Sequence, residues 1–505
     1  MSTFSGITEM ISSGDPASPA IGAPERQTMS RGDLAALVAR VGADLRGIGI
    51  GRRDAVAIVM PNGPEMASAF LAVAASCVAA PLNAAYRGDE FDFYLGDLDA
   101  QALILPAGAE SPAREIAAKR KIRVIELTPD LAGPAGAFSL SIPAGSGAVV
   151  PPSPDDVALV LHTSGTTSRP KIVPLTQRNL MTSAGNIART LALTPADRSL
   201  VIMPLFHIHG LIGALLSSLY AGGSVHCPPG FNALKFFGQL DEAGATWYSA
   251  VPTMHQTILA RAKGNAEIIA RRKLRFIRSS SASLPAPVML ALEEAFGCPV
   301  IESYGMTEAA HQMASNPLPP KARKPGSVGI AAGPEVAIMS AEGKILKPGE
   351  VGEIVIKGAN VTPGYANNPK ANEEAFRDGW FRTGDLGIMD TEGYVSLTGR
   401  LKEIINRGGE KISPREVDDV LMEHPAVAQI VTFALPHDKL GEEVAAAVVL
   451  KEGAAASERD LRDFAAQRLA DFKVPKKIVF LPEIPKGATG KLQRIGLAQK
   501  LGLAS

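Results

Sequence analysis

A hydroxyl-rich loop follows an apolar run in the first half of the chain. Residues 163–171 (TSGTTSRPK) come directly after Val157–Leu161, a run typical of a buried strand. Such a loop can turn backbone N–H groups, hydroxyls and the Lys171 ammonium toward one anion, and we expect a polyphosphate there. No GxxxxGK[ST] motif occurs in the chain, so the loop predicts a nucleotide enzyme outside the P-loop class. A solvated surface loop is the alternative.

A second segment offers groups for a base, a phosphate and a metal. Residues 303–308 (SYGMTE) follow the apolar pair at 300–301, where we expect another strand. A Tyr ring beside a Gly can lie close against a base. Thr307 can donate to a phosphate, and Glu308 offers the hard oxygen that Mg²⁺ prefers beside phosphate oxygens. Alone, the segment is equally typical of an ordinary loop.

Three later segments add a carboxylate, two glycines and a lysine. Asp385, in 379–385 (GWFRTGD), can accept hydrogen bonds from both ribose hydroxyls, although an Asx-turn explains the same pattern. The glycine pair 408–409 lets the backbone approach a ligand closely. Lys491 ends 485–491 (PKGATGK), where a single lysine is ordinarily a surface charge. Each signal is weak by itself, and their order along the chain makes them specific.

The elements that must position these groups predict an α/β fold of layered subdomains. Roughly the first 400 residues alternate apolar runs with helical patterns, which favours largely parallel strands. Strands are expected at 54–60, 102–105, 200–203 and 300–301, with an Ala-rich helix at 64–80. From about 325 to 399 the chain becomes rich in Gly and Pro, and 353–357 alternates, which predicts a small β-rich subdomain.

The last hundred residues predict a separate, small α+β domain. Ser413 is expected as a helix N-cap, followed by Pro414 and by Glu416, which would complete a capping box. Two strands, near 428–435 and 444–450, precede a second helix that begins near Ser457. We therefore expect an N-terminal domain over 1–399 and a C-terminal domain over 400–505.

Composition narrows the classes of function. A chain of 505 residues exceeds one ordinary core, so several subdomains are expected. Lys+Arg and Asp+Glu balance at 51 each, which gives no argument for nucleic acid or an anionic membrane as a partner. Three separated cysteines suggest a reducing compartment. Without a signal peptide or an apolar run long enough to span a membrane, we expect a cytoplasmic protein, monomeric or homodimeric.

Together these segments resemble the ANL superfamily of adenylate-forming enzymes, which comprises acyl-CoA synthetases, carrier-loading adenylation domains and luciferases. The resemblance covers essentially the whole chain and implies the ANL fold. Two departures stand out: this chain has Ser168 and Ile172 where the family usually has glycine. The hydroxyls and Lys171 remain, so the departures narrow the flexibility of the loop without removing its donors.

Several segments are similar to the oxalate–CoA ligases of plants and fungi. They are 207–210 (HIHG), 247–253 (WYSAVPT), 278–284 (RSSSASL), 306–313 (MTEAAHQM), 315–319 (SNPLP) and 405–414 (INRGGEKISP). The resemblance implies ATP-dependent formation of an acyl-AMP and then an acyl-CoA, with ATP, Mg²⁺ and coenzyme A, and with oxalate as the preferred acid. Malonate, a short or medium-chain fatty acid, the loading of a carrier protein, and a noncatalytic nucleotide-binding relative are the alternatives.

The resemblance also implies residue roles. The phosphate loop holds the β- and γ-phosphates through Thr163, Ser164, Gly165, Thr166, Thr167 and Lys171. Other nucleotide and coenzyme contacts are Ser281, Ala282, Ser283, Glu302, Ser303, Tyr304, Gly305, Met306, Asp385, Arg400, Lys402, Gly408 and Gly409. The catalytic groups are Lys491, Thr307, Glu308 and His207, with Glu308 as the Mg²⁺ ligand. The C-terminal domain rotates about Lys402 between the two half-reactions.

Oxalate carries a second carboxylate, which must not be buried without a partner. The segments expected around the acid supply His207, Ser280, Ser281 and His311 rather than an apolar lining. We assign His311 and the serines to the distal carboxylate, and His207 to the reacting carboxylate. The alternative for His207 is a gate or packing residue, and the alternative for His311 is a satisfied buried imidazole. The pair His207-x-His209 shows no third ligand of a metal site in the sequence.

Overall fold

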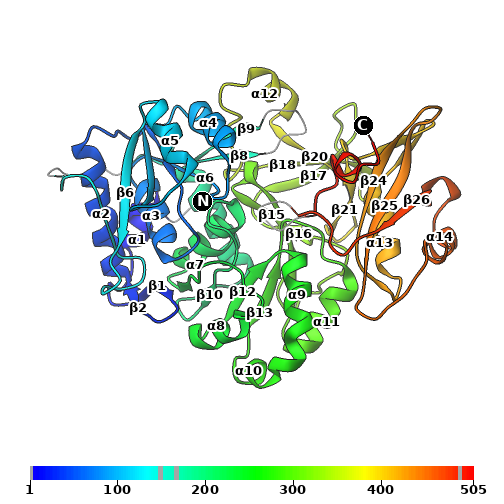
Figure 1. Cartoon of the computed structure of the whole chain (residues 1–505), viewed down its shortest axis with the longest axis horizontal. Helices are drawn as coiled ribbons and strands as arrows, with labels where there is room; N and C mark the ends of the chain where they lie inside the picture. Colours follow the sequence, from blue (N-terminus) through cyan, green and yellow to red (C-terminus); the bar gives the residue numbers. More distant parts are fainter. Residues whose placement is uncertain (1–3, 146–151, 164–169, 487–491, 505) are drawn as a thin grey trace.

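The computed structural model describes residues 4–145, 152–163, 170–486 and 492–504. The chain forms three sheets in its N-terminal part and a fourth in a small C-terminal domain, which lies at one end of the molecule (orange to red in Figure 1). The layered α/β class and the small α+β C-terminal domain are confirmed.

The first large sheet has seven strands in the order β7-β6-β5-β3-β4-β8-β9. Its central pairs are parallel, and the edge pairs β6–β7 and β8–β9 are antiparallel. The strands are β3 (Ala55–Ile58), β4 (Val78–Pro81), β5 (Ala102–Pro106), β6 (Arg123–Pro129), β7 (Phe138–Leu140), β8 (Val157–Thr163) and β9 (Lys171–Thr176). Strands β8 and β9, on either side of the predicted phosphate loop in the sequence, are therefore adjacent at the edge of this sheet.

The second large sheet has nine strands in the order β16-β15-β14-β13-β12-β10-β11-β1-β2. Its strands are β1 (Pro19–Ala23), β2 (Arg26–Ser30), β10 (Arg198–Leu200), β11 (Ser224–His226), β12 (Trp247–Ala250), β13 (Phe276–Ser279), β14 (Val300–Met306), β15 (His311–Ser315) and β16 (Ile330–Ala331). Parallel strands β12, β13 and β14 end side by side, so the residues that follow them meet at one edge.

Helices fill the space between the two large sheets and cover their outer faces. The N-terminal helices are α1 (Ile7–Ser12), α2 (Arg31–Gly47), α3 (Pro64–Ala74), α4 (Gly88–Asp97), α5 (Pro112–Lys119), α6 (Gln177–Thr190), α7 (Ser217–Tyr220), α8 (Phe236–Ala243), α9 (Pro252–Ala262), α10 (Ala266–Arg271) and α11 (Ala286–Phe296). A π-helix, η1 (His209–Leu216), precedes α7, and short 3₁₀ turns η2 (Lys263–Asn265) and η3 (Thr307–Ala309) follow α9 and β14. In α3, every residue except Glu65 is buried, because its core includes residues of both sheets.

A five-stranded antiparallel sheet forms the β-rich subdomain. It contains β17 (Glu335–Met339), β18 (Val351–Lys357), β19 (Phe376–Arg377), β20 (Trp380–Met389) and β21 (Val395–Arg400), with helix α12 (Pro369–Ala375) before β19. The pairing of β20 with β21 sets Asp385 opposite Arg400. The expected subdomain is therefore present, and its sheet brings two predicted site residues together.

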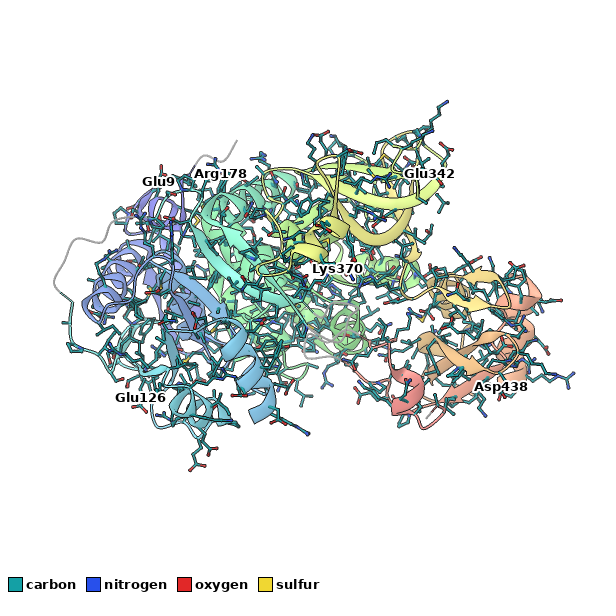
Figure 2. All side chains as sticks on the ribbon, turned by 90° about the horizontal axis from the view of Figure 1, so that it is seen from above. Glu9, Glu126, Arg178, Glu342, Lys370 and Asp438 are labelled. Atoms are coloured by element: carbon teal, nitrogen blue, oxygen red, sulfur yellow. The ribbon has the colours of Figure 1, made fainter. Side chains whose placement is uncertain are left out.

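The C-terminal domain packs three helices on a five-stranded sheet. Its elements are β22 (Ile405–Arg407), β23 (Glu410–Ile412), α13 (Pro414–Met422), β24 (Val427–His437), β25 (Gly441–Leu450), α14 (Glu458–Ala466), η4 (Asp471–Lys473), β26 (Lys477–Phe480) and α15 (Leu497–Lys500). Figure 2 shows this domain, marked by Asp438, on the opposite side of the molecule from Glu126.

Three local predictions differ from the structure. The helix expected over 64–80 ends at Ala74, and Val78–Pro81 form strand β4, because these small residues pair with β3 in the buried sheet. The strand expected at 200–203 ends at Leu200. Ser413 does precede α13, but its hydroxyl donates to the carbonyl of Thr398 instead of capping the helix. Glu416 instead forms an ion pair with Lys473, 2.7 Å away.

In the part of the chain that the structure describes, no helix is both long and apolar enough to cross a membrane.

Candidate active site

Asp385 and Tyr304, which are buried, and Arg400, whose side chain is about half exposed, form a cluster where β20, β14 and β21 approach one another. The Asp385 side chain is buried; it accepts from the Tyr304 hydroxyl, and Arg400 Nε donates to its Oδ1 over 2.6 Å. Burial and the carboxylate of Asp385 raise the pKa of Tyr304 well above its usual value. Burial opposes the charge of Arg400, yet the ion pair raises its pKa above the usual value. A carboxylate held so firmly is suited to accept hydroxyl donors.

Glu308, in η3 directly after β14, forms a second buried carboxylate site. Tyr365 Oη donates to its Oε1 over 2.9 Å, and Lys171 Nζ lies 4.3 Å from the centre of the same tyrosine ring. Burial raises the pKa of Glu308, whereas the hydrogen bond from Tyr365 and the charges of Lys171 and Arg400 lower it. The structure thus brings Glu308 near the lysine of the phosphate loop.

Lys171 begins β9, and its charge interacts with that of Lys402, which lies beyond the expected domain boundary. Burial lowers the pKa of Lys171, the like charge of Lys402 lowers it further, and Glu308 and Glu374 raise it. The interaction with Lys402 places the expected hinge lysine within electrostatic reach of the phosphate loop. A lysine, a carboxylate and a tyrosine hydroxyl together fit a Mg²⁺–phosphate group, since Mg²⁺ takes one or two carboxylates plus phosphate oxygens.

A second group of side chains, which we name the histidine–arginine cluster, consists of His209, Ser249, Arg278, Ser281, His311 and Gln312. His209, at the start of π-helix η1, is fully buried; its Nε2 lies 2.6 Å from Ser249 Oγ and its Nδ1 lies 3.0 Å from Ser281 Oγ. The rings of His209 and His311 stack with centroids 5.0 Å apart. Two of the residues expected at the acid, Ser281 and His311, therefore meet around His209.

Arg278, on β13, lies at the centre of this cluster. Its side chain is fully buried, and it donates to His311 Nε2 over 3.0 Å, to Gln312 Oε1 over 3.3 Å and to Ser249 Oγ over 3.4 Å. Burial lowers the pKa of Arg278 to about 9, so the guanidinium stays charged at neutral pH. None of these acceptors is a carboxylate.

Two residues of the cluster have strained backbones. Ser281 has φ 73° and His311 has φ 102°, in the region that favours glycine. Such conformations cost about 1–3 kcal/mol each and persist where the surroundings fix them, often at functional sites. Glycines make room for the His311 ring: a Cβ at Gly213 would lie 2.6 Å from Nε2, and one at Gly305 would lie 3.2 Å from Nδ1.

The C-terminal domain touches the segment that follows β13. Arg415 Nη2, on α13, donates to Ser283 Oγ over 2.6 Å, and Gln256 Nε2, on α9, donates to the carbonyl of Ala428 over 3.3 Å. Near this contact, burial raises the pKa of Glu302 to about 7, and the charge of Arg415 partly offsets the rise. The contact joins Ser283, one of the expected nucleotide and coenzyme contacts, to the C-terminal domain.

The other predicted residues are placed as follows. Ser280 Oγ donates to the carbonyl of Ser303 over 3.1 Å, so these two segments are tied together. Thr163 and Thr307 end β8 and begin η3, and His207 Nδ1 accepts from the backbone N–H of His209 over 3.3 Å. Gly408 and Gly409 form the turn between β22 and β23, with φ 57° and 97°. Residues 164–167 and Lys491 lie outside the described residues.

Sequence reasoning gave no role to Arg278 or Tyr365. Arg278 had one usable signal, a charged residue directly after the apolar pair Phe276-Ile277, where no strand was predicted. Tyr365 had none, because its partner Glu308 lies 57 residues away in the sequence. Within the described ranges, no group of three or more His, Cys, Asp or Glu side chains is arranged to hold a metal by itself.

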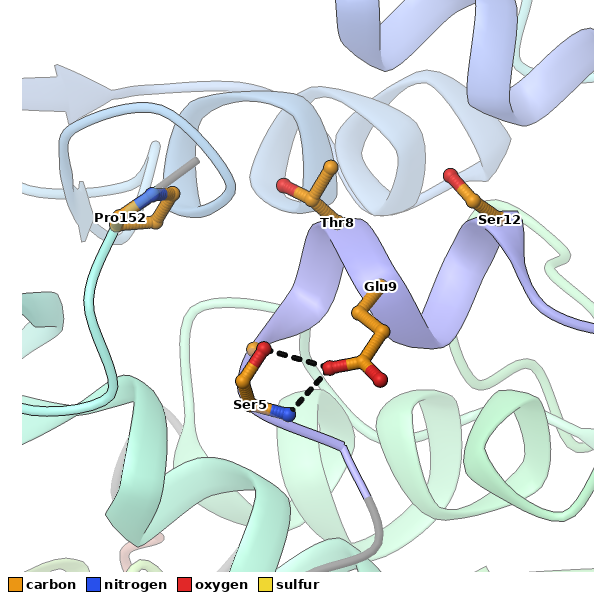
Figure 3. A pocket seen from close by; sticks show the side chains of 6 residues that line it. Ser5, Thr8, Glu9, Ser12 and Pro152 are labelled. Carbon is orange, nitrogen blue, oxygen red and sulfur yellow. Dashed lines mark hydrogen bonds between the residues drawn. The ribbon is translucent and has the colours of Figure 1, made fainter. Parts of the chain in front are cut away.

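A surface hollow near the N-terminus is unrelated to these clusters. It is lined by Ser5, Gly6, Thr8, Glu9, Ser12 and Pro152 (Figure 3). Glu9 there accepts from the backbone N–H and the hydroxyl of Ser5, 2.7 and 2.5 Å away. Its carboxylate is thus satisfied by Ser5, two residues before the start of α1.

The chain belongs to the AMP-binding enzyme family: residues 11–366 match the AMP-binding enzyme family and residues 416–491 match its C-terminal domain. It is 47% identical to an oxalate–CoA ligase of Arabidopsis thaliana over 98% of both chains. It is 44% identical to an oxalate–CoA ligase of Saccharomyces cerevisiae over 90% of this chain and 88% of that one. Among solved structures, ATP-bound MatB from Rhodopseudomonas palustris superposes with a TM-score of 0.89, at 31% identity and 99% coverage of both chains.

Proposed function

We propose that this protein is an ATP-dependent, AMP-forming acid–CoA ligase whose preferred acid is oxalate. One carboxylate of the acid attacks the α-phosphate of ATP and pyrophosphate leaves; the thiol of coenzyme A then attacks the acyl-AMP and AMP leaves. The observation that carries the proposal is the near full-length identity to two oxalate–CoA ligases. A buried cluster of imidazoles, hydroxyls and a guanidinium supports it.

The residues divide the work between two clusters. Asp385 and Arg400 hold the ribose, Tyr304 and the Ser281–Ser283 segment flank adenine, and Thr307 holds the α-phosphate. Glu308 and Lys171 fit Mg²⁺ and the outer phosphates, where the ion neutralises charge on the departing pyrophosphate. His311, Ser280 and Ser281 bind the distal carboxylate, and His207 lies by the reacting one.

The two half-reactions need different residues around the same carbonyl group of the acid. The C-terminal domain is therefore proposed to rotate about Lys402 between them. The boundary is proposed between residues 399 and 400. Lys491 serves adenylation, and the turn at Gly408 and Gly409 lines the path of the coenzyme thiol in the second step. Free, buried cysteines suit a reducing compartment, and we propose the cytoplasm.

The direct test is AMP release with ATP, Mg²⁺, coenzyme A and a panel of acids: oxalate, malonate, acetate and a medium-chain fatty acid. We expect the highest kcat/KM with oxalate. His311→Ala should lower kcat/KM for oxalate about 10- to 100-fold, since a hydrogen bond to a charged group contributes about 1.5–3 kcal/mol. His437→Ala, at an exposed position of the C-terminal domain, is the matched control. If malonate or a fatty acid is preferred, or if His311→Ala is silent, the oxalate assignment is wrong.

A further inference from the structure

Arg278 is a buried cation without a carboxylate partner among the described residues. Its side chain is fully buried, its three hydrogen-bond acceptors are neutral groups, and its Nε has no partner. Burying a charge is costly unless another charge or a complete set of hydrogen bonds compensates it. A cation retained in this state is compensated when an anion binds nearby.

The hydrogen bonds of Arg278 also fix the chemistry of His311. A guanidinium only donates hydrogen bonds, so His311 Nε2 must accept the one it receives. A neutral imidazole whose Nε2 accepts carries its proton on Nδ1. The Nδ1 edge of the ring faces Gly305, in the strand that leads to Thr307 and Glu308, because a Cβ there would lie 3.2 Å from Nδ1.

The same guanidinium reaches the other proposed ligand of the acid. Arg278 donates to Ser249 Oγ, Ser249 Oγ lies 2.6 Å from His209 Nε2, and His209 Nδ1 lies 3.0 Å from Ser281 Oγ. One hydrogen bond thus links Arg278 to His311, and a chain of three hydrogen bonds links it to Ser281. These are the two cluster residues whose φ angles are positive, and strain of this kind persists only where neighbours hold the residue in place.

We propose that Arg278 is the positioning residue of the acid site: it holds His311 as an Nδ1–H donor, orders Ser281 through Ser249 and His209, and supplies the buried positive charge that selects acids with a second anionic group. This inference rests on the proposed function of the same site. Arg278 itself does not touch the reacting atoms.

Two substitutions and one matched control test the proposal. Arg278→Met removes both the donors and the charge, whereas Arg278→Lys keeps the charge and loses the planar set of donors. Arg31→Met is the control, because Arg31 is also buried and donates only to the carbonyls of Met10 and Leu219. Both methionine variants lose a buried arginine, so a general loss of stability affects them alike.

We expect Arg278→Met to raise KM for oxalate about 10- to 100-fold and to leave KM for ATP within about twofold. Its preference for oxalate over acetate, measured as a ratio of kcat/KM values, should fall by a similar factor. Arg278→Lys should recover part of this ratio, and Arg31→Met should keep it unchanged. The proposal would be overturned if Arg278→Met raised KM for oxalate and KM for ATP by the same factor, or if it left KM for oxalate unchanged.

A spectroscopic measurement keeps the inference testable apart from activity. The chain has 8 histidines, so ¹⁵N-histidine labelling gives few signals, and His311→Gln identifies that of His311. We expect the Nδ1–H tautomer in the unsubstituted protein and in Arg31→Met, and its loss in Arg278→Met, which removes the guanidinium donor to His311 Nε2. A proton on Nε2 in the unsubstituted protein contradicts the inference even if oxalate is the substrate. If no acid releases AMP, the proposed function fails, and this measurement still decides whether Arg278 sets the tautomer.

Discussion

The two clusters of the candidate site differ in the sign of their buried charged groups. On the side that we assign to the nucleotide, two buried carboxylates, Asp385 and Glu308, accept hydrogen bonds from the hydroxyls of Tyr304 and Tyr365. In the histidine–arginine cluster, the buried charge is the guanidinium of Arg278, and its acceptors are neutral. The buried carboxylates lie where we expect the ribose hydroxyls and Mg²⁺ to bind. The buried guanidinium lies where we expect the anionic acid to bind.

The two sides also differ in how they respond to a ligand. If Asp385 receives ribose hydroxyls, as we propose, it must share or exchange the bonds that it accepts from Tyr304 and Arg400. The histidine–arginine cluster is already ordered by its own hydrogen bonds, so an arriving acid meets donors that need little rearrangement. Preorganised donors of this kind are most effective where water is excluded. Substitutions on the nucleotide side should therefore act on kcat and on KM for ATP, and those in the cluster on KM for the acid.

Glu308→Gln provides the strongest test of this division. Replacing the carboxylate by an amide removes the charge that would hold Mg²⁺ at the phosphates, and we expect kcat to fall about 10²- to 10³-fold. The KM for oxalate should change little. Glu373→Gln, exposed on α12, is the matched control and should behave like the unsubstituted enzyme in steady-state kinetics. A large rise in KM for oxalate with kcat preserved would show that the two sides are not separable.

Tyr365→Phe should have a smaller effect that depends on pH. The hydroxyl of Tyr365 lowers the pKa of Glu308 against the rise caused by burial, so its removal raises that pKa further. Activity that needs the carboxylate is lost as pH falls through this pKa, and the acidic limb of the kcat profile should therefore move to higher pH. At neutral pH we expect a loss of about tenfold or less.

Tyr394→Phe is the control for this substitution, since the Tyr394 hydroxyl donates to the carbonyl of Ala322 over 2.7 Å in the β-rich subdomain. Its profile should superimpose on that of the unsubstituted enzyme. An acidic limb of Tyr365→Phe that stays in place would mean that Glu308 is not the group that titrates.

The sequence predicted the local elements better than the partners of the buried side chains. Val157–Thr163 and Gly441–Leu450 lie close to their expected positions because apolar runs and alternation are properties of neighbouring residues. Strand β4 was missed because Val78–Pro81, short and Ala-rich, continue a helical pattern, and only the pairing with β3 makes them a strand. Tertiary packing overrides local propensity in such cases.

The same limit applies to the site. Asp385 was found from its turn residues, and its pairing with Arg400 follows from two adjacent antiparallel strands. The environment of Arg278 could not be deduced, because three different strands and a π-helix supply its surroundings. The capping prediction for Ser413 failed for a related reason: the carbonyl of Thr398, from the neighbouring sheet, offered its hydroxyl another acceptor.

Arg415→Ala should have the smallest effect, which we expect on the stability of the protein. Arg415 forms the contact between the C-terminal domain and Ser283, in the segment that follows β13. The substitution removes the hydrogen bond to Ser283 and an attractive charge near Glu302, whose pKa burial raises to about 7. The raised pKa means that the stability contributed by protonated Glu302 is present below about pH 4.5 and is lost as pH rises through about 7. Arg415 offsets part of that loss by stabilising the ionised form.

The difference between Arg415→Ala and the unsubstituted protein should therefore be small at pH 5, where Glu302 is protonated, and largest at pH 8. We expect the two proteins to differ in free energy of unfolding by on the order of 1 kcal/mol at pH 8. The difference is followed as the shift in the midpoint of thermal unfolding, recorded by circular dichroism. Arg459→Ala, whose side chain is 89% exposed on α14, removes a charge from the same domain without this contact and should show no pH-dependent difference. A difference for Arg415→Ala that is equal at both pH values would be explained by the bond to Ser283 and the ion pair with Asp419, and would mean that Arg415 does not stabilise ionised Glu302.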